Sequence, residues 1–272
     1  MSFSRMFCFG LFLFWAIPAT GEEPTATAEK SEDELAKEAQ NPVADIYSFP
    51  FQDNIGLNYG PNKGVQNILN FQPVIPIHAG PLNVITRTII PLVTQPSAVA
   101  GDDSATTGLG DISFTAFLSP AKPGALIWGI GPVLTFPTAT SSQVGSQSTW
   151  GLGPSVVLLT MPGPWVIGVL SNVVWSIAGD SGNSFLLQYF INYNFGGGWY
   201  VTTSPIITAV WNLPGQTSGS QWTVPFGAGF GKLQKFGKLP INFTAQAYWS
   251  AIHPDSLPYA PWTLRLQVTV LL

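Results

Sequence analysis

The 272-residue chain carries only 9% charged residues, with a formal net charge of −4 and a pI near 5.0. This acidic balance leaves no basic footprint for nucleic acid, and the charged fraction is far below the roughly 25% of ordinary soluble domains. Hydrophobic residues make up 46% of the chain and mean hydropathy is +0.26. No internal apolar run reaches the length of a membrane-spanning helix, so the composition favours a protein that crosses a membrane with strands.

The N-terminus has the features of a secretory signal peptide. A weakly basic start at Arg5 precedes an apolar run over residues 6–18, and the small residues of Ala19-Thr20-Gly21 include the positions that a signal peptidase reads. We therefore predict that residues 1–21 form a signal peptide that is cut before Glu22. The alternative is an N-terminal membrane anchor, which the shortness of the run disfavours.

A polar, acidic leader follows over residues 22–41 and is expected in the periplasm. Its segment Ser31–Glu34 starts like a capped helix that continues to Ala39. The leader lacks an apolar stripe of any size, so we expect it to be flexible or loosely helical. Cys8, the only cysteine, lies in the predicted signal peptide, so the mature chain would hold no disulfide and no cysteine-based metal site or nucleophile.

From residue 42 onward, apolar and polar residues alternate in segments that are separated by turn residues. We predict about twelve strands, an even number as in single-chain outer-membrane barrels. Their expected spans are 43–59, 64–78, 82–95, 108–118, 126–137, 150–160, 165–177, 185–195, 199–212, 222–232, 240–252 and 262–272. The predicted fold of residues 42–272 is an all-β, antiparallel, up-and-down transmembrane barrel in the bacterial outer membrane.

The segment Trp262–Leu272 shows the alternation most clearly. Its even positions are Trp, Leu, Leu, Val, Val and Leu, whereas its odd positions are polar as far as Thr269. A period of two places these sets on opposite strand faces, and the segment has about the length of a tilted strand that crosses a bilayer. We therefore expect the even face to meet lipid and the odd face to line the lumen.

The connections between the expected strands differ on the two sides of the membrane. Long polar loops on one side and short turns on the other are typical of bacterial barrels. The expected outward loops are 96–107, 138–149, 179–183, 214–220 and 254–261, and the expected inward turns are 79–81, 161–164 and 196–198.

Several stretches, spread in order over nearly the whole expected mature chain, resemble one known family. These stretches are 41–46, 70–76, 86–91, 108–112, 128–132, 163–165, 204–208, 222–225 and 229–232. They are similar to the outer-membrane transporters associated with the meta pathway of phenol degradation. The resemblance implies a β-barrel in the outer membrane and a role in the passage of aromatic or other hydrophobic compounds.

By strand parity, the expected lumen is polar but almost uncharged. Porins select ions with rings of charge, whereas a lining of amides and hydroxyls suits the passive passage of small, neutral hydrophobic or aromatic compounds. A structural or adhesive barrel, in which these groups bond to one another and close the lumen, stays an open alternative. The predicted lining residues are Asn70, Gln72, Gln188, Asn192, Asn242, Gln246 and Gln267.

Three charged residues, Arg87, Asp111 and Arg265, are also expected to face the lumen. A buried charge normally needs a partner, and Asp111 is the candidate acid for either arginine. We predict either a structural ion pair, which is the favoured interpretation, or a selectivity filter.

A lipid hydrolase at the outer rim is a further, less favoured alternative. Ser250, His253 and Asp255 would lie near one another there, but without a nucleophile elbow. The glycine-rich segment 227–231 lies within an expected strand and resembles a nucleotide loop only superficially. We predict no enzymatic activity, no cofactor and no metal. The expected partners are membrane lipid, lipopolysaccharide, a small neutral or hydrophobic solute and the barrel-insertion machinery.

Overall fold

The computed structural model describes residues 30–179, 182–212, 221–255 and 257–272. The chain divides into two units, Met1–Lys30 and Ser31–Leu272, and every element below belongs to the second unit. The predicted signal peptide and the predicted loop 214–220 lie outside the described residues. Among the residues described, no helix is both long and apolar enough to span a membrane.

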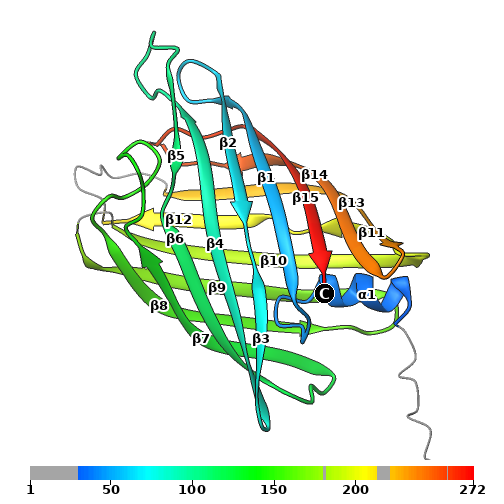
Figure 1. Ribbon diagram of the computed structural model, residues 1–272. Coiled ribbons are helices and arrows are strands. Elements are labelled where there is room, and N and C mark those ends of the chain that lie inside the picture. Colours follow the sequence, from blue (N-terminus) through cyan, green and yellow to red (C-terminus); the bar gives the residue numbers. More distant parts are fainter. Residues whose placement is uncertain (1–29, 180–181, 213–220, 256) are drawn as a thin grey trace, which may run out of the picture. The chain divides into compact units, whose positions relative to one another are not determined.

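A single antiparallel sheet of 15 strands makes up most of this unit (Figure 1). The strands are β1 (Ser48–Tyr59), β2 (Gly64–Phe71), β3 (Val74–Ala79), β4 (Leu82–Pro96), β5 (Ala105–Leu109), β6 (Ile112–Pro120), β7 (Leu126–Phe136), β8 (Trp150–Thr160), β9 (Trp165–Ala178), β10 (Asn183–Gly196), β11 (Trp199–Thr203), β12 (Ile206–Trp211), β13 (Trp222–Phe236), β14 (Leu239–Ile252) and β15 (Trp262–Leu271). Three pairs (β2 with β3, β5 with β6, β11 with β12) are interrupted strands, so the wall has 12 crossings, as the sequence predicts.

The sheet closes on itself between its first and last strands. β1 pairs with β15 in an unbroken antiparallel register from Ser48 opposite Leu271 to Leu57 opposite Trp262. Because the two edge strands of the sheet pair with each other, no row of unpaired backbone groups faces lipid along this seam. The predicted fold class, a closed antiparallel barrel, is confirmed.

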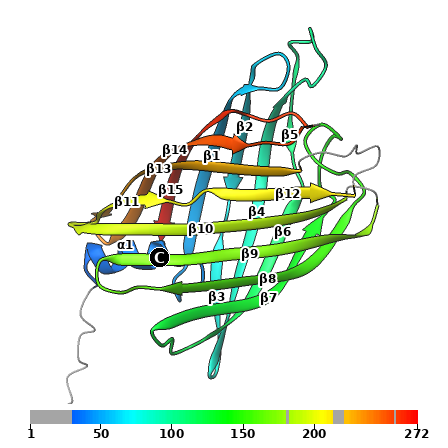
Figure 2. The same cartoon turned by 180° about the vertical axis from the view of Figure 1, so that it is seen from behind.

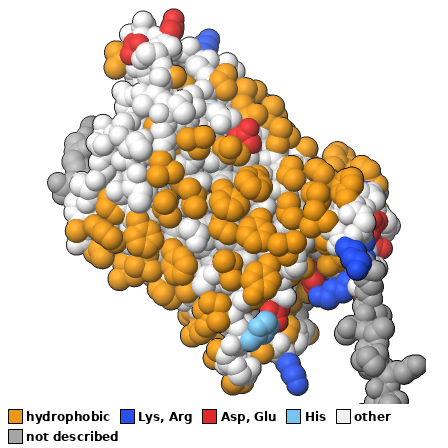
Figure 3. Space-filling model, in the orientation of Figure 1, with side chains coloured by type: hydrophobic (Ala, Val, Ile, Leu, Met, Phe, Trp, Pro, Cys, Tyr) orange, Lys and Arg blue, Asp and Glu red, His pale blue; other side chains and the backbone are white. Residues whose placement is uncertain are grey.

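The two faces of the wall differ as the alternation requires. On β15, Leu264, Leu266 and Val268 are exposed, whereas the intervening Arg265 is buried with only 6% of its surface exposed. Figure 3 shows hydrophobic side chains over the middle of the visible face, with few charged side chains among them. This outward belt is the surface that a bilayer covers.

The described part of the leader is better ordered than expected. Residues Glu32–Ala39 form a helix, α1, whose N-terminus has a complete capping box between Ser31 and Glu34. Leu35 and Ala36 are buried against Leu233 and Leu271 at the ends of β13 and β15. The capped helix that the sequence indicates from Ser31 to Ala39 is confirmed. The preference for a flexible or loosely helical segment is wrong for these residues, because a docking surface far along the chain supplies the apolar contact that the helix lacks by itself.

Polar bonds fix α1 at the end of the barrel that carries the short turns, which we call the turn end (Figures 1 and 2). The Asp33 carboxylate accepts from the backbone N–H of Gly198 at 2.7 Å, in the turn between β10 and β11. The ammonium of Lys37 donates to the carbonyl of Gly163 at 2.5 Å, in the turn between β8 and β9. The following residues, Ala39 to Pro42, line the lumen cavity, so this segment runs into the barrel.

The interior is apolar on one side, which the sequence interpretation did not anticipate. A cluster of buried hydrophobic residues fills the lumen beside β3, β4 and β6 to β10. Its members are Val43, Val74, Ile85, Phe117, Ile127, Val157, Leu159, Val166, Leu170 and Phe190. Strand β8 alternates buried and exposed residues, and its buried face has Ser155 as its one polar side chain, so polarity marks the inside of this strand only weakly.

The boundaries of the strands differ from the predicted spans in a few places. β1 begins at Ser48 rather than at residue 43, because the preceding segment is drawn into the lumen. β5 extends the wall into the predicted loop 96–107. The interruption after β11 falls at Ser204 and Pro205, where proline has no N–H to donate to a neighbouring strand.

The register of the closing seam predicts where a disulfide forms. Ile55 and Leu264 are directly opposite and both face outward, so Ile55→Cys with Leu264→Cys should crosslink on oxidation in a Cys8→Ser background. Ile55→Cys with Thr263→Cys should not, because a shift of one residue points the second side chain into the lumen. Mobility of the heat-unfolded protein in reducing and non-reducing gels measures both. Crosslinking of the second pair alone would contradict the register.

Candidate functional site

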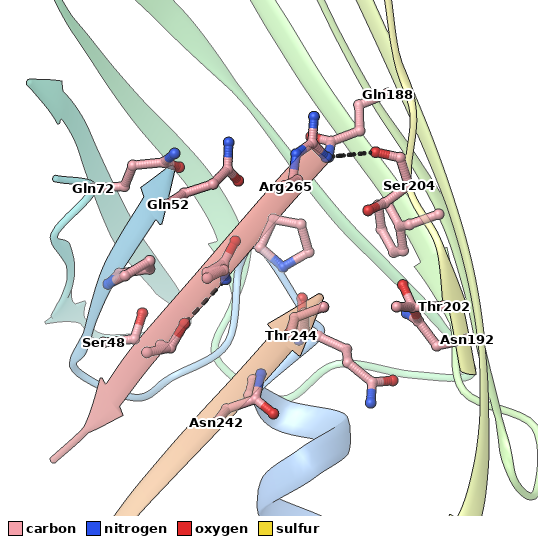
Figure 4. Close-up of a pocket in the computed structure, with 18 of the residues that line it drawn as sticks. Ser48, Gln52, Gln72, Gln188, Asn192, Thr202, Ser204, Asn242, Thr244 and Arg265 are labelled. Atoms are coloured by element: carbon pink, nitrogen blue, oxygen red, sulfur yellow. Dashed lines mark hydrogen bonds between the residues drawn. The ribbon is translucent and has the colours of Figure 1, made fainter. Parts of the chain in front are cut away.

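A cavity of about 160 Å³ lies in the lumen, between the apolar cluster and the wall formed by β10 to β15 and β1. Its floor on the turn side includes Ala39, Gln40 and Asn41 from the end of α1 and the residues that follow. Most of its remaining lining is amide or hydroxyl side chains, as Figure 4 shows. The cavity therefore combines hydrogen-bonding groups with an apolar flank at Phe190 and Val74.

Six of the seven predicted polar lining residues border this cavity. They are Gln72, Gln188, Asn192, Asn242, Gln246 and Gln267. Asn70 does not border it, although its register opposite Gln52 places it on the inward face of β2. Gln52, Tyr200 and Ser204 also line the cavity and were missed as lining residues. The inward position of Gln52 could have been predicted from the alternation of residues in β1. The position of Ser204 could not, because it depends on the interruption between β11 and β12.

Side chains of β11 and β14 form a ladder of hydrogen bonds that passes over β13, the strand between them. This ladder is one wall of the cavity. The Tyr200 hydroxyl donates to Asn242 Oδ1 at 3.0 Å and lies 3.0 Å from Thr244 Oγ1. One step along, Gln246 Nε2 donates to Thr202 Oγ1 at 3.2 Å and to Ser204 Oγ at 2.9 Å.

The glycine-rich segment of β13 makes this ladder possible. Gly231 stands between Tyr200 on one side and Thr244 on the other, and a Cβ at Gly231 would meet the ring of Tyr200. Gly229 holds the same place between Thr202 and Gln246. The space beside these two glycines is occupied by side chains of the neighbouring strands.

Arg265 reaches into the cavity from β15. Its Nε donates to Asn54 Oδ1 at 2.8 Å and its Nη1 donates to the carbonyl of Ser204 at 2.9 Å. Its guanidinium also lies 5.0 Å from the ring centre of Tyr248, within the range of a cation–π contact. Figure 4 shows the bond to Ser204, across the interruption between β11 and β12.

Arg87 lies on β4 and lines the same cavity. Its Nη2 donates to Gln72 Oε1 at 2.5 Å. Within the described ranges, no carboxylate pairs with either arginine, and the lining residues include no acid.

The predicted ion pair between Asp111 and an arginine is wrong. Asp111 falls in the interruption between β5 and β6, and its carboxylate accepts from the backbone N–H groups of Ala139 and Ser146 at 3.2 and 2.5 Å. The break in the strand turns the side chain toward the loop 137–149, away from the cavity. Since Arg87 is opposite Thr115, Asp111 is also displaced by roughly 13 Å along the strand direction.

The loop 137–149 covers the interior at the opposite end of the barrel. Ala139 and Val144 are buried against Val93 of β4. Together with the Asp111 contacts, this packing holds the loop against the inward face. The cavity thus lies between the residues that follow α1 at the turn end and this loop at the other end.

The rim residues considered for lipid hydrolysis are arranged differently from a catalytic triad. The Ser250 hydroxyl donates to the carbonyl of Ala260 at 2.9 Å. The ring of His253 stacks on Tyr259, with ring centres 3.8 Å apart, and its Nδ1 lies 3.3 Å from the carbonyl oxygen of Pro254. This geometry directs Ser250 and His253 to different partners, so it gives the hydrolase alternative no support.

The closed wall, its apolar outer belt and its polar cavity define a transmembrane β-barrel. Single-chain antiparallel barrels of this kind span the outer membrane of bacteria, which agrees with the localisation expected from the sequence.

Comparison with known proteins adds structural relatives. The sequence matches no family model and no curated protein. The structure is similar to the crystal structure of an outer membrane channel from Pseudomonas putida F1, with a TM-score of 0.58 and 15% identity over 84% of this chain and 94% of that chain. This similarity shows a shared barrel fold.

Two further solved structures overlap less closely. One is the CymD monoaromatic hydrocarbon channel, with a TM-score of 0.45 and 10% identity over 89% of this chain and 90% of that chain. The other is outer membrane phospholipase A from Escherichia coli, with a TM-score of 0.40 and 12% identity over 85% of this chain and 97% of that chain.

The contact between Gly231 and Tyr200 predicts a destabilising substitution. Gly231→Ala should displace the Tyr200 ring and break its two hydrogen bonds, which lowers the stability of the barrel by about 1–3 kcal/mol. Gly124→Ala is the matched control, because a Cβ at Gly124 meets nothing within 4 Å. The temperature at which each refolded protein loses its heat-modifiable gel mobility measures the effect. Equal temperatures for the two variants would show that the ladder contributes nothing.

Proposed function

We propose that this protein is an outer-membrane channel for the passive passage of small hydrophobic or aromatic compounds. The observation that carries the proposal is the lumen cavity, which has hydrogen-bonding groups on one side and the buried ring of Phe190 on the other. A cavity of similar size in a protein core can hold a benzene ring, so a volume of about 160 Å³ suits one small aromatic molecule.

Two further observations support the proposal. The structural relative from Pseudomonas putida F1 is described as an outer membrane channel. The resemblance of the sequence to transporters associated with phenol degradation also favours an aromatic solute. The link to that pathway stays a prediction, as do the cleaved signal peptide over residues 1–21 and partnership with lipopolysaccharide and the barrel-insertion machinery.

A barrel with a closed lumen is the second candidate, and one observation favours it. The cavity is bordered at the turn end by Ala39 to Pro42, and toward the other end of the barrel the loop 137–149 packs inward against Val93 of β4. In a channel, at least one of these segments must move aside during passage. The two candidates therefore differ in whether a solute crosses the folded barrel.

Uptake into vesicles separates the two candidates. Refolded protein in liposomes that contain lipopolysaccharide should take up labelled benzyl alcohol severalfold faster than vesicles without protein, because the lumen offers a path through a poorly permeable leaflet. A correctly folded barrel with no uptake above the empty vesicles would rule out the channel.

A matched pair of variants shows whether uptake uses the lumen. Thr244→Trp should reduce uptake to near the background, because Thr244 lines the cavity and an indole ring fills it. Ala245→Trp should leave uptake unchanged, because Ala245 is the next residue of β14 and is exposed on the outward face. Equal uptake by the two variants would place the path outside this cavity.

A further inference from the structure

The lumen cavity holds two positive charges and no negative one among its described lining residues. Arg87 enters from β4 and Arg265 enters from β15, on opposite sides of β1 to β3 in the order of strands around the wall. With Asp111 bound to the loop 137–149, the sequence-based expectation of a nearly neutral lumen does not hold. The cavity has a local charge of +2.

The partners of both guanidinium groups are neutral. Arg265 donates to an amide oxygen of Asn54 and to the Ser204 carbonyl, and Arg87 donates to an amide oxygen of Gln72. A guanidinium has five N–H donors in a fixed fork. Three hydrogen bonds therefore account for only part of the ten donors that the two groups carry, and both groups border open space in the cavity.

Removing a guanidinium from water is unfavourable unless charge and hydrogen bonds compensate for it. Neutral oxygens and the Tyr248 ring supply some compensation for Arg265. A negative charge in the cavity would supply the remainder, and a carboxylate matches the planar fork of arginine with two parallel hydrogen bonds. The two arginines therefore make the cavity complementary to an anion.

The remaining lining restricts which anion fits. Phe190 and Val74 of the apolar cluster border the cavity, so an organic group gains burial there that an inorganic ion does not. The side-chain amides of Gln72 and Gln188 can serve a carboxylate as additional hydrogen-bond donors. The volume of about 160 Å³ limits the organic part to about one ring.

We propose that the cavity is a binding site for a small aromatic carboxylate, whose negative charge is held by Arg87 and Arg265. This inference rests on the proposed channel function and narrows it. Among small aromatic solutes, the barrel would select those that carry a carboxylate.

Binding to the refolded full-length protein in detergent tests the site without requiring transport. Fluorine NMR titrations compare 4-fluorobenzoate with 4-fluorobenzyl alcohol, which has the same ring and no charge. We expect the carboxylate to bind at least about tenfold more tightly, because charge-assisted hydrogen bonds are lost with the alcohol. Equal affinity for the two compounds would overturn the proposal.

Charge-neutral variants identify the residues responsible. Arg265→Gln and Arg87→Gln should each weaken 4-fluorobenzoate binding by about tenfold and change binding of the alcohol by less than about twofold. Lys122→Gln, which removes an exposed charge in the turn between β6 and β7, should change neither. An equal loss in Lys122→Gln would show that only the overall charge matters and would reject the site.

A conservative variant and a competing ion test for misfolding and for a general anion site, and comparison with the uptake experiment separates this inference from the channel proposal. Arg265→Lys keeps the charge without the fork, so it should retain more affinity than Arg265→Gln if the barrel is folded. Inorganic phosphate at equal concentration should not displace 4-fluorobenzoate, and displacement would show a general anion site instead. If the vesicles take up benzyl alcohol but the protein binds 4-fluorobenzoate and 4-fluorobenzyl alcohol equally, this inference alone is rejected. If the protein binds the carboxylate preferentially but the vesicles show no uptake, the channel alone is rejected.

Discussion

The structure depends on the pairing of β1 with β15. In the hydrocarbon core of a membrane no water is present to bond to the backbone, so each N–H and C=O must find a partner within the protein. An open sheet would fail this requirement at both edges. The continuous register from Ser48 to Leu57 against β15 meets it, and it brings Asn54 beside Arg265. Closure of the wall and assembly of the cavity are thus consequences of the same seam.

The interior of the barrel is filled in two ways, by apolar packing on one side and by hydrogen-bonded polar side chains on the other. On the side of β3 to β10, large apolar side chains pack as in the core of a soluble protein. On the other side, polar groups bond to one another across the glycines of β13, so each buried hydroxyl or amide in the ladder has a partner. The cavity lies where these two kinds of packing meet, which explains why its lining is amphipathic.

The sequence predicted the wall well, because lipid on one side imposes a period of two on every strand. Parity placed Gln188 and Asn192 toward the lumen, where they border the cavity. Polarity alone was a weak guide for β8, because an inward-facing Val157 and a lipid-facing Val156 are the same residue type. In this strand the small residues Gly151, Gly153 and Ser155, rather than a polar set, lie on the face toward the interior of the barrel.

Other features depended on contacts that a sequence pattern does not contain. Asp111 has the parity of an inward residue, but the interruption between β5 and β6 redirects its carboxylate to the loop 137–149. α1 has only Leu35 and Ala36 to bury, and their partners Leu233 and Leu271 lie about 200 residues away. The charge of the cavity follows from the first of these errors, since Asp111 bonds to the loop 137–149 instead of to an arginine of the cavity.

The docking of α1 has a consequence for the order of assembly. The surface that receives Leu35 and Ala36 is made by the ends of β13 and β15, which are among the last strands of the barrel in chain order. This surface is complete only after those strands have been positioned. The N-terminal helix therefore cannot reach its final place early, although it precedes every strand in the chain. Its arrival at the turn end therefore has to follow the placement of β13 and β15 in the wall.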